Sequence, residues 1–143
     1  MTLVYPALLG KPILIACVAD LLTGNRFLFP MLLDTGADET CFPAKYAGFF
    51  GHDNHDPRVA RKRCRGVGGS SLAYIHSVRL SLLDPDKSTR SNHVIAWTAK
   101  TGSASFLEKL DLGCGLLGMD IIRQWKSVCI ENTAKGLRLI VCV

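Results

Sequence analysis

The sequence predicts one all-β domain, spanning residues 1–143, with one or two short helices. Its apolar segments are short and rich in β-branched or aromatic residues, and turn-forming Gly, Pro, Asn and Asp residues separate them. The length of 143 residues is typical of a single domain, and a composition of 48% hydrophobic and 20% charged residues is that of an ordinary globular chain. These observations exclude a disordered tail, a coiled coil and a collagen-like fibre.

The chain is expected to begin with a β-hairpin. Residues 12–18 are predicted to form a buried strand and residues 26–33 a second strand, with a turn at residues 23–25. Pro30 lies inside the second strand, where proline has no N–H to donate to a neighbouring strand. We therefore expect this strand either to start late or to have an open edge at Pro30.

A polar stretch and a glycine-rich hairpin follow. Residues 44–65 are mostly polar and are interpreted as a surface loop. Three glycines within residues 66–69 indicate the tip of a hairpin, because glycine readily adopts turn conformations. Apolar residues alternate within residues 71–83, which predicts strands, and Asp-Pro-Asp at residues 84–86 predicts a turn.

The last third of the chain is predicted to contain three strands and two short helices. Residues 92–97 have the composition of a strand, and the connection after them is expected to hold a short helix around residues 105–110. Apolar residues at helical spacing predict a helix within residues 120–126. Two strands are expected at the end, over residues 127–130 and 136–143.

One short basic run accounts for the whole net charge of +5. Its members are Arg58, Arg61, Lys62, Arg63 and Arg65. A surface that binds nucleic acid usually interleaves aromatic with basic residues, and this run contains no aromatic residue. We therefore expect a solvated loop or a contact with an anionic partner, and we expect no nucleic-acid partner. A nucleic-acid-binding β-barrel is the less favoured alternative.

The six cysteines are expected to be free thiols. None of them forms a Cys-x-x-Cys pair, and several lie in apolar runs, where cysteine behaves as a small hydrophobic residue. His52, His55 and Cys64 are candidate zinc ligands, but a structural zinc site uses four. We therefore expect no metal.

No segment is predicted to enter a membrane. The most apolar stretch, residues 12–22, is shorter than a bilayer requires and contains Asp20. Residues 1–5 lack the basic start and long apolar core of a signal peptide. We therefore expect a soluble, cytoplasmic protein.

Two motifs carry the functional information. The first is Leu33-Asp34-Thr35-Gly36-Ala37, in which an apolar strand ends in a carboxylate, a threonine and a glycine. Turn chemistry alone would explain the aspartate and the glycine. It would not explain the second motif, Gly115-Leu116-Leu117-Gly118-Met119-Asp120, which places an apolar pair and a glycine before a short apolar helix.

These two motifs, with the glycines of residues 66–69 between them, resemble the retropepsin-like aspartic proteases in kind and in order. The resemblance runs from about residue 12 to residue 143. It implies a closed, barrel-like β fold with a flap hairpin, a homodimer, and an aspartic endopeptidase that needs no cofactor and acts on a peptide or protein substrate.

The chemistry of this class needs two carboxylates. Two like charges held about 3 Å apart cannot both ionise, so the pair shares one proton, and one member accepts a proton from water while the other polarises the carbonyl. The chain has only one Asp-Thr-Gly sequence, at Asp34. A twofold homodimer would supply the second carboxylate, because a symmetric contact brings each residue to its own mate.

The resemblance assigns roles to the neighbouring residues. Asp34 is the expected catalytic residue, Thr35 would hydrogen-bond across the dimer axis, and Gly36 would let the substrate backbone approach closely. Leu116 and Leu117 would pack beneath the catalytic loop as core. The expected substrate-binding residues are Ala37, Asp38, Glu39, Gly66, Val67, Gly68 and Gly69.

The sequence departs from the viral pattern after Gly118. Viral members usually carry an arginine at the position of Met119, where it pairs with the acid that Asp38 matches. Here the partner of Asp38 is Arg123, Arg26 or none. Met119-Asp120 is more similar to the cellular and bacterial members.

Two functions compete. An active endopeptidase is favoured because Asp34, Thr35 and Gly36 are intact, and a domain that only binds peptides or scaffolds a partner has no chemical need for them. The C-terminal strand-forming run, residues 139–143, would be an exposed edge in a single chain. We therefore expect it to be covered in a dimer in which both termini contribute strands, with residues 1–4 as the pairing partner.

Overall fold

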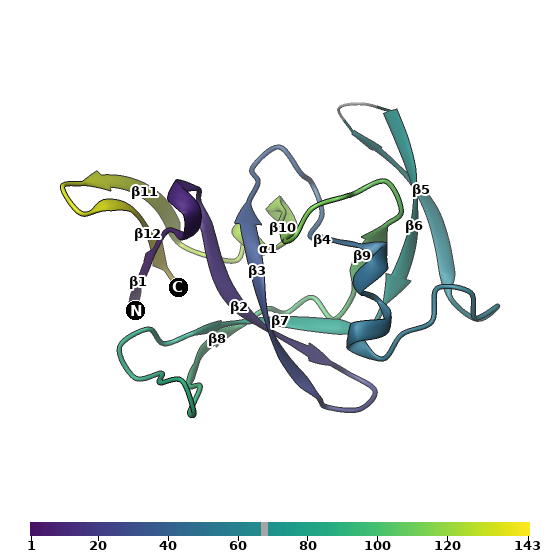
Figure 1. Cartoon of the computed structure of the whole chain (residues 1–143), viewed down its shortest axis with the longest axis horizontal. Coiled ribbons are helices and arrows are strands. Elements are labelled where there is room, and N and C mark those ends of the chain that lie inside the picture. Colours follow the sequence, from purple (N-terminus) through teal and green to yellow (C-terminus); the bar gives the residue numbers. More distant parts are fainter. Residues whose placement is uncertain (67–68) are drawn as a thin grey trace.

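The chain is built mainly of β-strands, as the sequence predicted (Figure 1). The computed structural model describes residues 1–66 and 69–143. The strands are β1 Thr2–Pro6, β2 Ile13–Asp20, β3 Arg26–Leu33, β4 Cys41–Pro43, β5 Ala60–Gly66, β6 Gly69–His76, β7 Val78–Leu83, β8 Ile95–Thr98, β9 Ala104–Leu107, β10 Gly115–Leu117, β11 Ser127–Thr133 and β12 Gly136–Cys142. The helices are the 3-10 turns η1 Leu8–Gly10, η2 Ala44–Tyr46 and η3 Gly48–Phe50, and the α-helix α1 Met119–Ile122. None of these helices is long and apolar enough to cross a bilayer.

The strands form two sheets. The larger has the order β5-β6-β9-β4-β10-β3-β2-β7-β8, and the smaller has the order β1-β12-β11. Among the described residues, β5 and β8 are the two ends of the larger sheet and do not pair with each other. Strand β10 lies at its centre, parallel to β3 and antiparallel to β4. The two sequence motifs therefore lie side by side, with Leu116 opposite Leu32.

The predicted N-terminal hairpin is confirmed. Strands β2 and β3 pair antiparallel, with Ala16 opposite Phe29. Pro30 lies within β3, and the pairing of β3 with β10 begins one residue later, at Met31. Pro30 therefore interrupts no bond to β10, which agrees with the open edge expected there.

Aromatic side chains fill the core beneath the larger sheet. Phe42, Phe50 and Phe106 are all fully buried, and the Phe42 and Phe106 rings stack at 5.1 Å between centroids. Phe29 packs edge-on against Phe42 at 5.4 Å. Burying each such ring stabilises the fold by roughly 2–3 kcal/mol, so this cluster fixes the strands on which the functional loops stand.

The helix predicted around residues 105–110 is wrong. Residues 104–107 form strand β9, which pairs with β6 on one side and β4 on the other. Ala104, Ser105 and Phe106 are buried in succession, as in a strand covered on both faces. The hydrogen bonds of β9 to two neighbouring strands stabilise the strand conformation over the helix that the weak local pattern predicted. These strand pairs involve residues far away in the sequence, so the local sequence does not show them.

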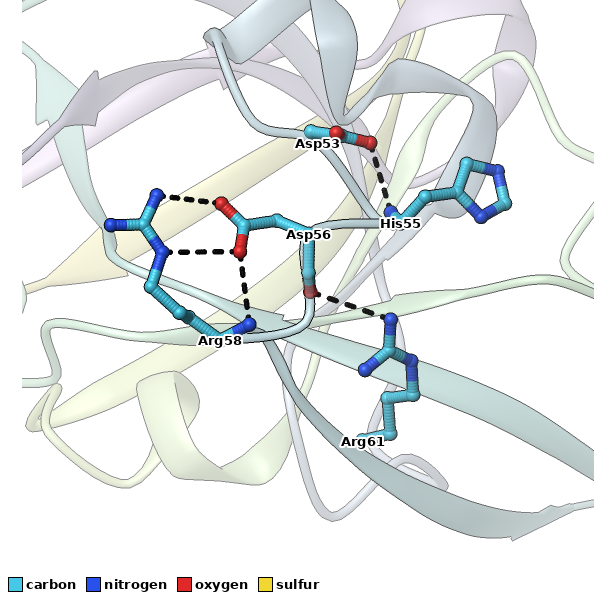
Figure 2. A network of polar contacts seen from close by, with 5 residues as sticks. All are labelled: Asp53, His55, Asp56, Arg58 and Arg61. Atoms are coloured by element: carbon cyan, nitrogen blue, oxygen red, sulfur yellow. Dashed lines mark hydrogen bonds and ion pairs between the residues drawn. The ribbon is translucent and has the colours of Figure 1, made fainter.

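The polar stretch at residues 44–65 is more ordered than a surface loop. It begins with η2 and η3 and ends in β5, which pairs along its whole length with β6. Between them, local bonds hold the chain: Arg58 binds the carboxylate of Asp56, and His55 donates its backbone N–H to Asp53 (Figure 2). These contacts lead the chain into β5, an edge strand that sequence reasoning missed.

Strand β10 was not predicted, and the other elements of the second half agree with prediction in kind and differ in length. Strand β8 begins at Ile95 rather than at residue 92, and the predicted helix within residues 120–126 is the single turn α1. Backbone bonds to Gly118 and Met119 continue the helical turn into Arg123.

The two chain ends meet in the smaller sheet (Figure 1). Strand β1 pairs antiparallel with β12, with Val4 opposite Ile140, and β11 covers the other edge of β12. The predicted pairing of the termini is confirmed, but it forms within one chain. The expectation that residues 139–143 would be an exposed edge is wrong, because β12 is the central strand of its sheet.

Two buried histidines stack where β6 meets η3. The rings of His52 and His76 lie 4.5 Å apart at an interplanar angle of 17°. The side-chain amide of Asn54 donates to a backbone carbonyl, so its oxygen faces Nε2 of His76 at 2.6 Å, and that nitrogen carries a proton. His52 lies 3.6 Å from the buried carboxylate of Asp20. Burial, and then the neighbouring His52, lower the pKa of His76 to about 4.

The pKa of His76 predicts a loss of stability in acid. The unfolded chain binds a proton near pH 6.5 and the folded chain only near pH 4, so the stability contributed by neutral His76 is complete above pH 6.5 and falls between these values. We expect the free energy of unfolding to fall by about 2 kcal/mol more between pH 7 and pH 4.5 in the wild type than in His76→Gln. Urea denaturation at each pH measures this. The exposed His93 gives the control, His93→Gln, and an equal pH dependence in wild type and His76→Gln would contradict the prediction.

Candidate active site

Asp34 lies directly after β3, at the start of a short loop that we name the Asp34 loop, residues 34–40. Its backbone N–H donates to the carbonyl of Leu117 at 3.0 Å, which fixes the start of the loop against β10. Its carboxylate Oδ1 accepts the N–H of Gly36 at 3.0 Å. A Cβ on Gly36 would lie 3.3 Å from that same oxygen, so glycine gives the loop room to fold over the carboxylate.

The second motif supports the Asp34 loop from below. The N–H of Met119 donates to the carbonyl of Ala37 at 2.8 Å, and the N–H of Asp120 donates to the carbonyl of Asp38 at 3.0 Å. Gly118 lies so close to the loop that a Cβ there would approach the carbonyl carbon of Glu39 to 2.3 Å. This contact explains why a glycine follows the two leucines.

Thr40 and Asp120 join the two motifs through side chains. Thr40 donates its N–H and its hydroxyl to Oδ1 of Asp120, at 2.9 and 2.8 Å. The same hydroxyl accepts the N–H of Gly118 at 3.1 Å. Sequence analysis included Asp120 in the second motif but gave it no role, and it did not single out Thr40. The available signal was Thr40 three residues after the first motif and Asp120 as the acid in the first turn of α1.

A cleft of about 880 Å³ opens above the Asp34 loop. It is lined by Asp34, Gly36, Ala37, Asp38, Glu39, Cys41, Lys62, Arg63, Cys64, Arg65, Gly66, Gly69, Ser70, Ser71, Leu107, Lys109, Leu110 and Leu116. The Asp34 loop and the β5–β6 hairpin, far apart in sequence, therefore face one space. This is the arrangement needed to hold an extended peptide over a carboxylate.

Most of the predicted site residues lie in this cleft. Thr35 is exposed and is not part of its lining. Val67 and Gly68 lie outside the described residues. Leu117 is fully buried as predicted, whereas Leu116 is half-buried and lines the cleft, so its assignment to the core alone is wrong.

An ion pair links the Asp34 loop to the hairpin across the cleft. Lys62 on β5 donates to Oε2 of Glu39 at 2.5 Å, and the hydroxyl of Ser105 donates to the same oxygen at 3.1 Å. The hydrogen bond from Lys62 lowers the pKa of Glu39, and the bond to Glu39 raises the pKa of Lys62. Both side chains therefore stay charged over the neutral and mildly acidic range.

Asp38 has no ion-pair partner among the described residues. Its side chain is exposed, and neither Arg123 nor Arg26 forms a salt bridge with it. Met119 supports the loop through its backbone N–H alone. The backbone bonds at Gly118 and α1 thus hold this loop without the arginine that the viral pattern uses.

The lining of the cleft includes two thiols, those of Cys41 and Cys64. All six cysteines are free, as the sequence predicted. Cys41 donates to the carbonyl of Glu39, and burial raises the pKa of its thiol to about 12, which disfavours a thiolate nucleophile. No group of three or more His, Cys, Asp or Glu residues within the described ranges is placed to hold a metal ion, so His52, His55 and Cys64 do not form such a group.

Comparison with known proteins rests on structure. No protein-family model and no curated protein matches the sequence. A retropepsin-like aspartic protease from Rickettsia conorii is similar, with a TM-score of 0.55 and 20% identity over 90% of this chain and 80% of that chain. EIAV protease, solved with an inhibitor, is similar with a TM-score of 0.52 and 18% identity over 84% of this chain and 92% of that chain.

The chain has the retropepsin-like aspartic protease fold. This agrees with the fold expected from the two motifs and with their placement on adjacent strands. The viral and the bacterial protein resemble the chain to similar degrees, so the closer likeness to cellular and bacterial members stays a prediction.

The backbone around Gly118 leaves no space for a side chain. We expect Gly118→Ala to lower the free energy of unfolding by about 3 kcal/mol or more, because the new methyl group would overlap the rigid backbone of Glu39 and Thr40. Gly113→Ala is the matched control, since a Cβ there meets nothing within 4 Å. Thermal and urea denaturation measure both variants, and equal stabilities would contradict this account of the contact.

Proposed function

We propose that residues 1–143 form one aspartic endopeptidase domain that acts as a homodimer. The observation that carries this proposal is the placement of Asp34 in a large cleft, with its carboxylate held by Gly36 and its backbone held by β10. The retropepsin-like fold supports it. A domain that only bound peptides would not require this arrangement around a carboxylate.

The second catalytic carboxylate comes from a second copy of the chain. In the cleft, the other acidic residues are Asp38 and Glu39, and Glu39 is bound by Lys62. A twofold axis beside the Asp34 loop brings two Asp34 side chains together, and the exposed Thr35 then reaches the partner's loop.

The reaction needs one proton shared by the two Asp34 carboxylates. The charged member accepts a proton from water as the water oxygen attacks the peptide carbonyl, while the protonated member donates a hydrogen bond to the carbonyl oxygen. Collapse of the tetrahedral intermediate breaks the C–N bond, and the amine leaves with a proton from the pair. The products are one carboxylic acid and one amine.

The remaining cleft residues bind the substrate. Backbone groups of Ala37, Asp38 and Glu39 pair with an extended peptide, and the β5–β6 hairpin acts as a flap over it. The free cysteines fit a reducing compartment, which supports a cytoplasmic location.

Replacing the catalytic carboxylate tests the proposal. We expect Asp34→Asn to lower the rate of peptide cleavage at least about a hundredfold, because an amide cannot accept the proton of water. Digestion of a diverse peptide library, read by mass spectrometry at several acidic pH values, measures the rate. The exposed Asp86 gives the control Asp86→Asn, which is expected to cleave like the wild type.

Two outcomes would overturn the proposal. Cleavage by Asp34→Asn at the wild-type rate would show that residues other than Asp34 carry out the reaction. Peptide binding without cleavage by either form would identify the chain as a peptide-binding or scaffolding domain.

The proposed dimer predicts that the specific activity depends on the protein concentration. If each active site takes one Asp34 from each chain, specific activity falls on dilution and tracks the fraction of dimer seen by analytical ultracentrifugation. Mixing wild type with an excess of Asp34→Asn is expected to suppress activity, because most wild-type chains then pair with an inactive partner. Full specific activity in a monomeric sample would refute the shared site.

A further inference from the structure

Strand β5 is an open edge of the larger sheet. It is the outermost strand on its side and pairs with β6 alone among the described residues (Figure 1). Apart from the bonds to β6, no backbone hydrogen bond joins residues 60–66 to the part of the chain that the structure describes. In an antiparallel pair, every second residue points its N–H and C=O away from its neighbour. The outer side of β5 therefore presents unpaired backbone groups that can accept a further strand.

Three arginines share one face of this edge strand. Arg61, Arg63 and Arg65 are exposed and occupy every second position of β5. Successive side chains of a strand point to opposite faces, and Lys62 reaches Glu39 from the other face. The arginine side chains therefore leave the strand on the face opposite the one that binds the Asp34 loop. We name this row the arginine stripe.

The arginine stripe keeps its positive charge. Arg61 donates to three backbone carbonyls, which are neutral acceptors and leave the charge of its guanidinium in place. Arg63 and Arg65 form no salt bridge within the described residues. A guanidinium stays protonated in proteins, so all three side chains carry a full charge at an exposed surface.

The acids beside the stripe lie at its Arg61 end. The carboxylate of Asp56 is bound by Arg58 (Figure 2). The carboxylate of Glu108 accepts the hydroxyl of Tyr74, which is the cross-strand neighbour of Arg61. Glu108 keeps its negative charge and offsets the first arginine of the stripe. The rest of the stripe, farther along β5, therefore remains positive.

We propose that the outer edge of β5 binds an extended acidic segment of a partner protein, which adds to the larger sheet as a further strand. The unpaired backbone groups of β5 hold the segment, and its Asp or Glu side chains lie beside the arginines as cross-strand pairs. Alternate side chains of an extended segment repeat about every 6.7 Å, as the arginines do along β5. This site is separate from Asp34 and does not depend on the proposed protease function.

A second copy of the chain is not the occupant that this edge favours. Two β5 strands paired edge to edge would bring basic side chains beside basic side chains, and like charges directly opposite each other destabilise a strand pair. Charged residues on an edge strand are a known means of preventing such self-pairing. The same charges stabilise a strand of opposite sign, so the partner is an acidic segment of a different protein.

A single-stranded nucleic acid also fits the stripe less well. Proteins bind single strands in basic grooves with exposed aromatic rings on which the bases stack. The ring of Tyr74, on the same face as the stripe, is 5% exposed and lies under the guanidinium of Arg61 at 5.5 Å from its centroid. This ring is therefore not available to a base, whereas a free strand edge is the feature that an extended peptide uses.

Three labelled peptides test the proposal. The first alternates Glu with Thr, the second has Gln in place of every Glu, and the third is the Glu peptide with N-methyl groups on its central backbone amides. Fluorescence anisotropy with Asp34→Asn at low salt measures binding without cleavage. We expect the Glu peptide to bind about tenfold more tightly than the Gln peptide, because several cross-strand ion pairs add together. We expect N-methylation to weaken binding at least about tenfold, because the methylated backbone cannot pair with β5.

Matched variants locate the effect on the stripe. Arg63→Gln with Arg65→Gln leaves the bonds of Arg61 intact and is expected to reduce the preference for the Glu peptide to about twofold. The control Arg90→Gln with Lys135→Gln removes exposed charge elsewhere and is expected to keep the full preference.

Hydrogen exchange locates the peptide without any change to the stripe, and it serves as the test if the double variant does not fold. The Glu peptide is expected to slow amide exchange of Asp34→Asn within residues 60–66 at least about tenfold, because their outward N–H groups become bonded. Exchange within residues 34–40 is expected to stay unchanged.

Four outcomes would overturn the proposal. Equal affinity for the Glu and Gln peptides, or undiminished binding of the N-methylated peptide, would leave the arginines as protection of an exposed edge. Tighter binding of a single-stranded oligonucleotide than of the Glu peptide would identify a nucleic-acid site. Slowed exchange within residues 34–40 in place of residues 60–66 would place the peptide in the cleft. None of these measurements depends on cleavage, so their result is independent of whether the chain is a protease.

Discussion

The close approach of Gly118 to the Asp34 loop is the constraint on which the rest of the site depends. Backbone groups of the two segments bond directly, from Met119 to Ala37 and from Asp120 to Asp38, and no side chain fits between them. Such hydrogen bonds vary little in geometry. They therefore fix the position and direction of the Asp34 carboxylate more firmly than an exposed ion pair would. The fold therefore positions Asp34 mainly through main-chain contacts. The hydrogen bonds from Thr40 to the Asp120 carboxylate join the same two segments through side chains.

Sequence alone predicted the parts that depend on local chemistry. Three features follow from short runs of residues whose local physical chemistry is clear. They are the Asp-Thr-Gly loop, the glycine after two leucines and the terminal strands. Strand β9 was missed because its pairing with β4 and β6 depends on residues far away in sequence. The bonds between Thr40 and Asp120 were not predicted for the same reason, since only the fold shows that these two residues touch.

The basic run shows why charge cannot be interpreted from sequence as a single patch. Five cations lie within eight residues, and the sequence gives no way to separate them. Alternation along β5 turns Lys62 toward Glu39, while a turn at Asp56 engages Arg58. The electrostatic character of the cleft therefore depends on which of these cations face it and which are paired, rather than on net charge.

The β5–β6 hairpin links these features. At one end β6 carries His76 into the buried histidine pair, and along β5 Lys62 ties the hairpin to the Asp34 loop through Glu39. The described part of the hairpin beyond Lys62 makes its strand contacts through β6 alone, because β5 is the edge of its sheet. Its base is therefore fixed to the core and to the Asp34 loop, while its outer half is held by fewer contacts. Segments with few anchoring contacts open at a lower free energy than segments that are firmly anchored. The Lys62–Glu39 pair ties β5 to the Asp34 loop at the point where the anchored part of the hairpin ends.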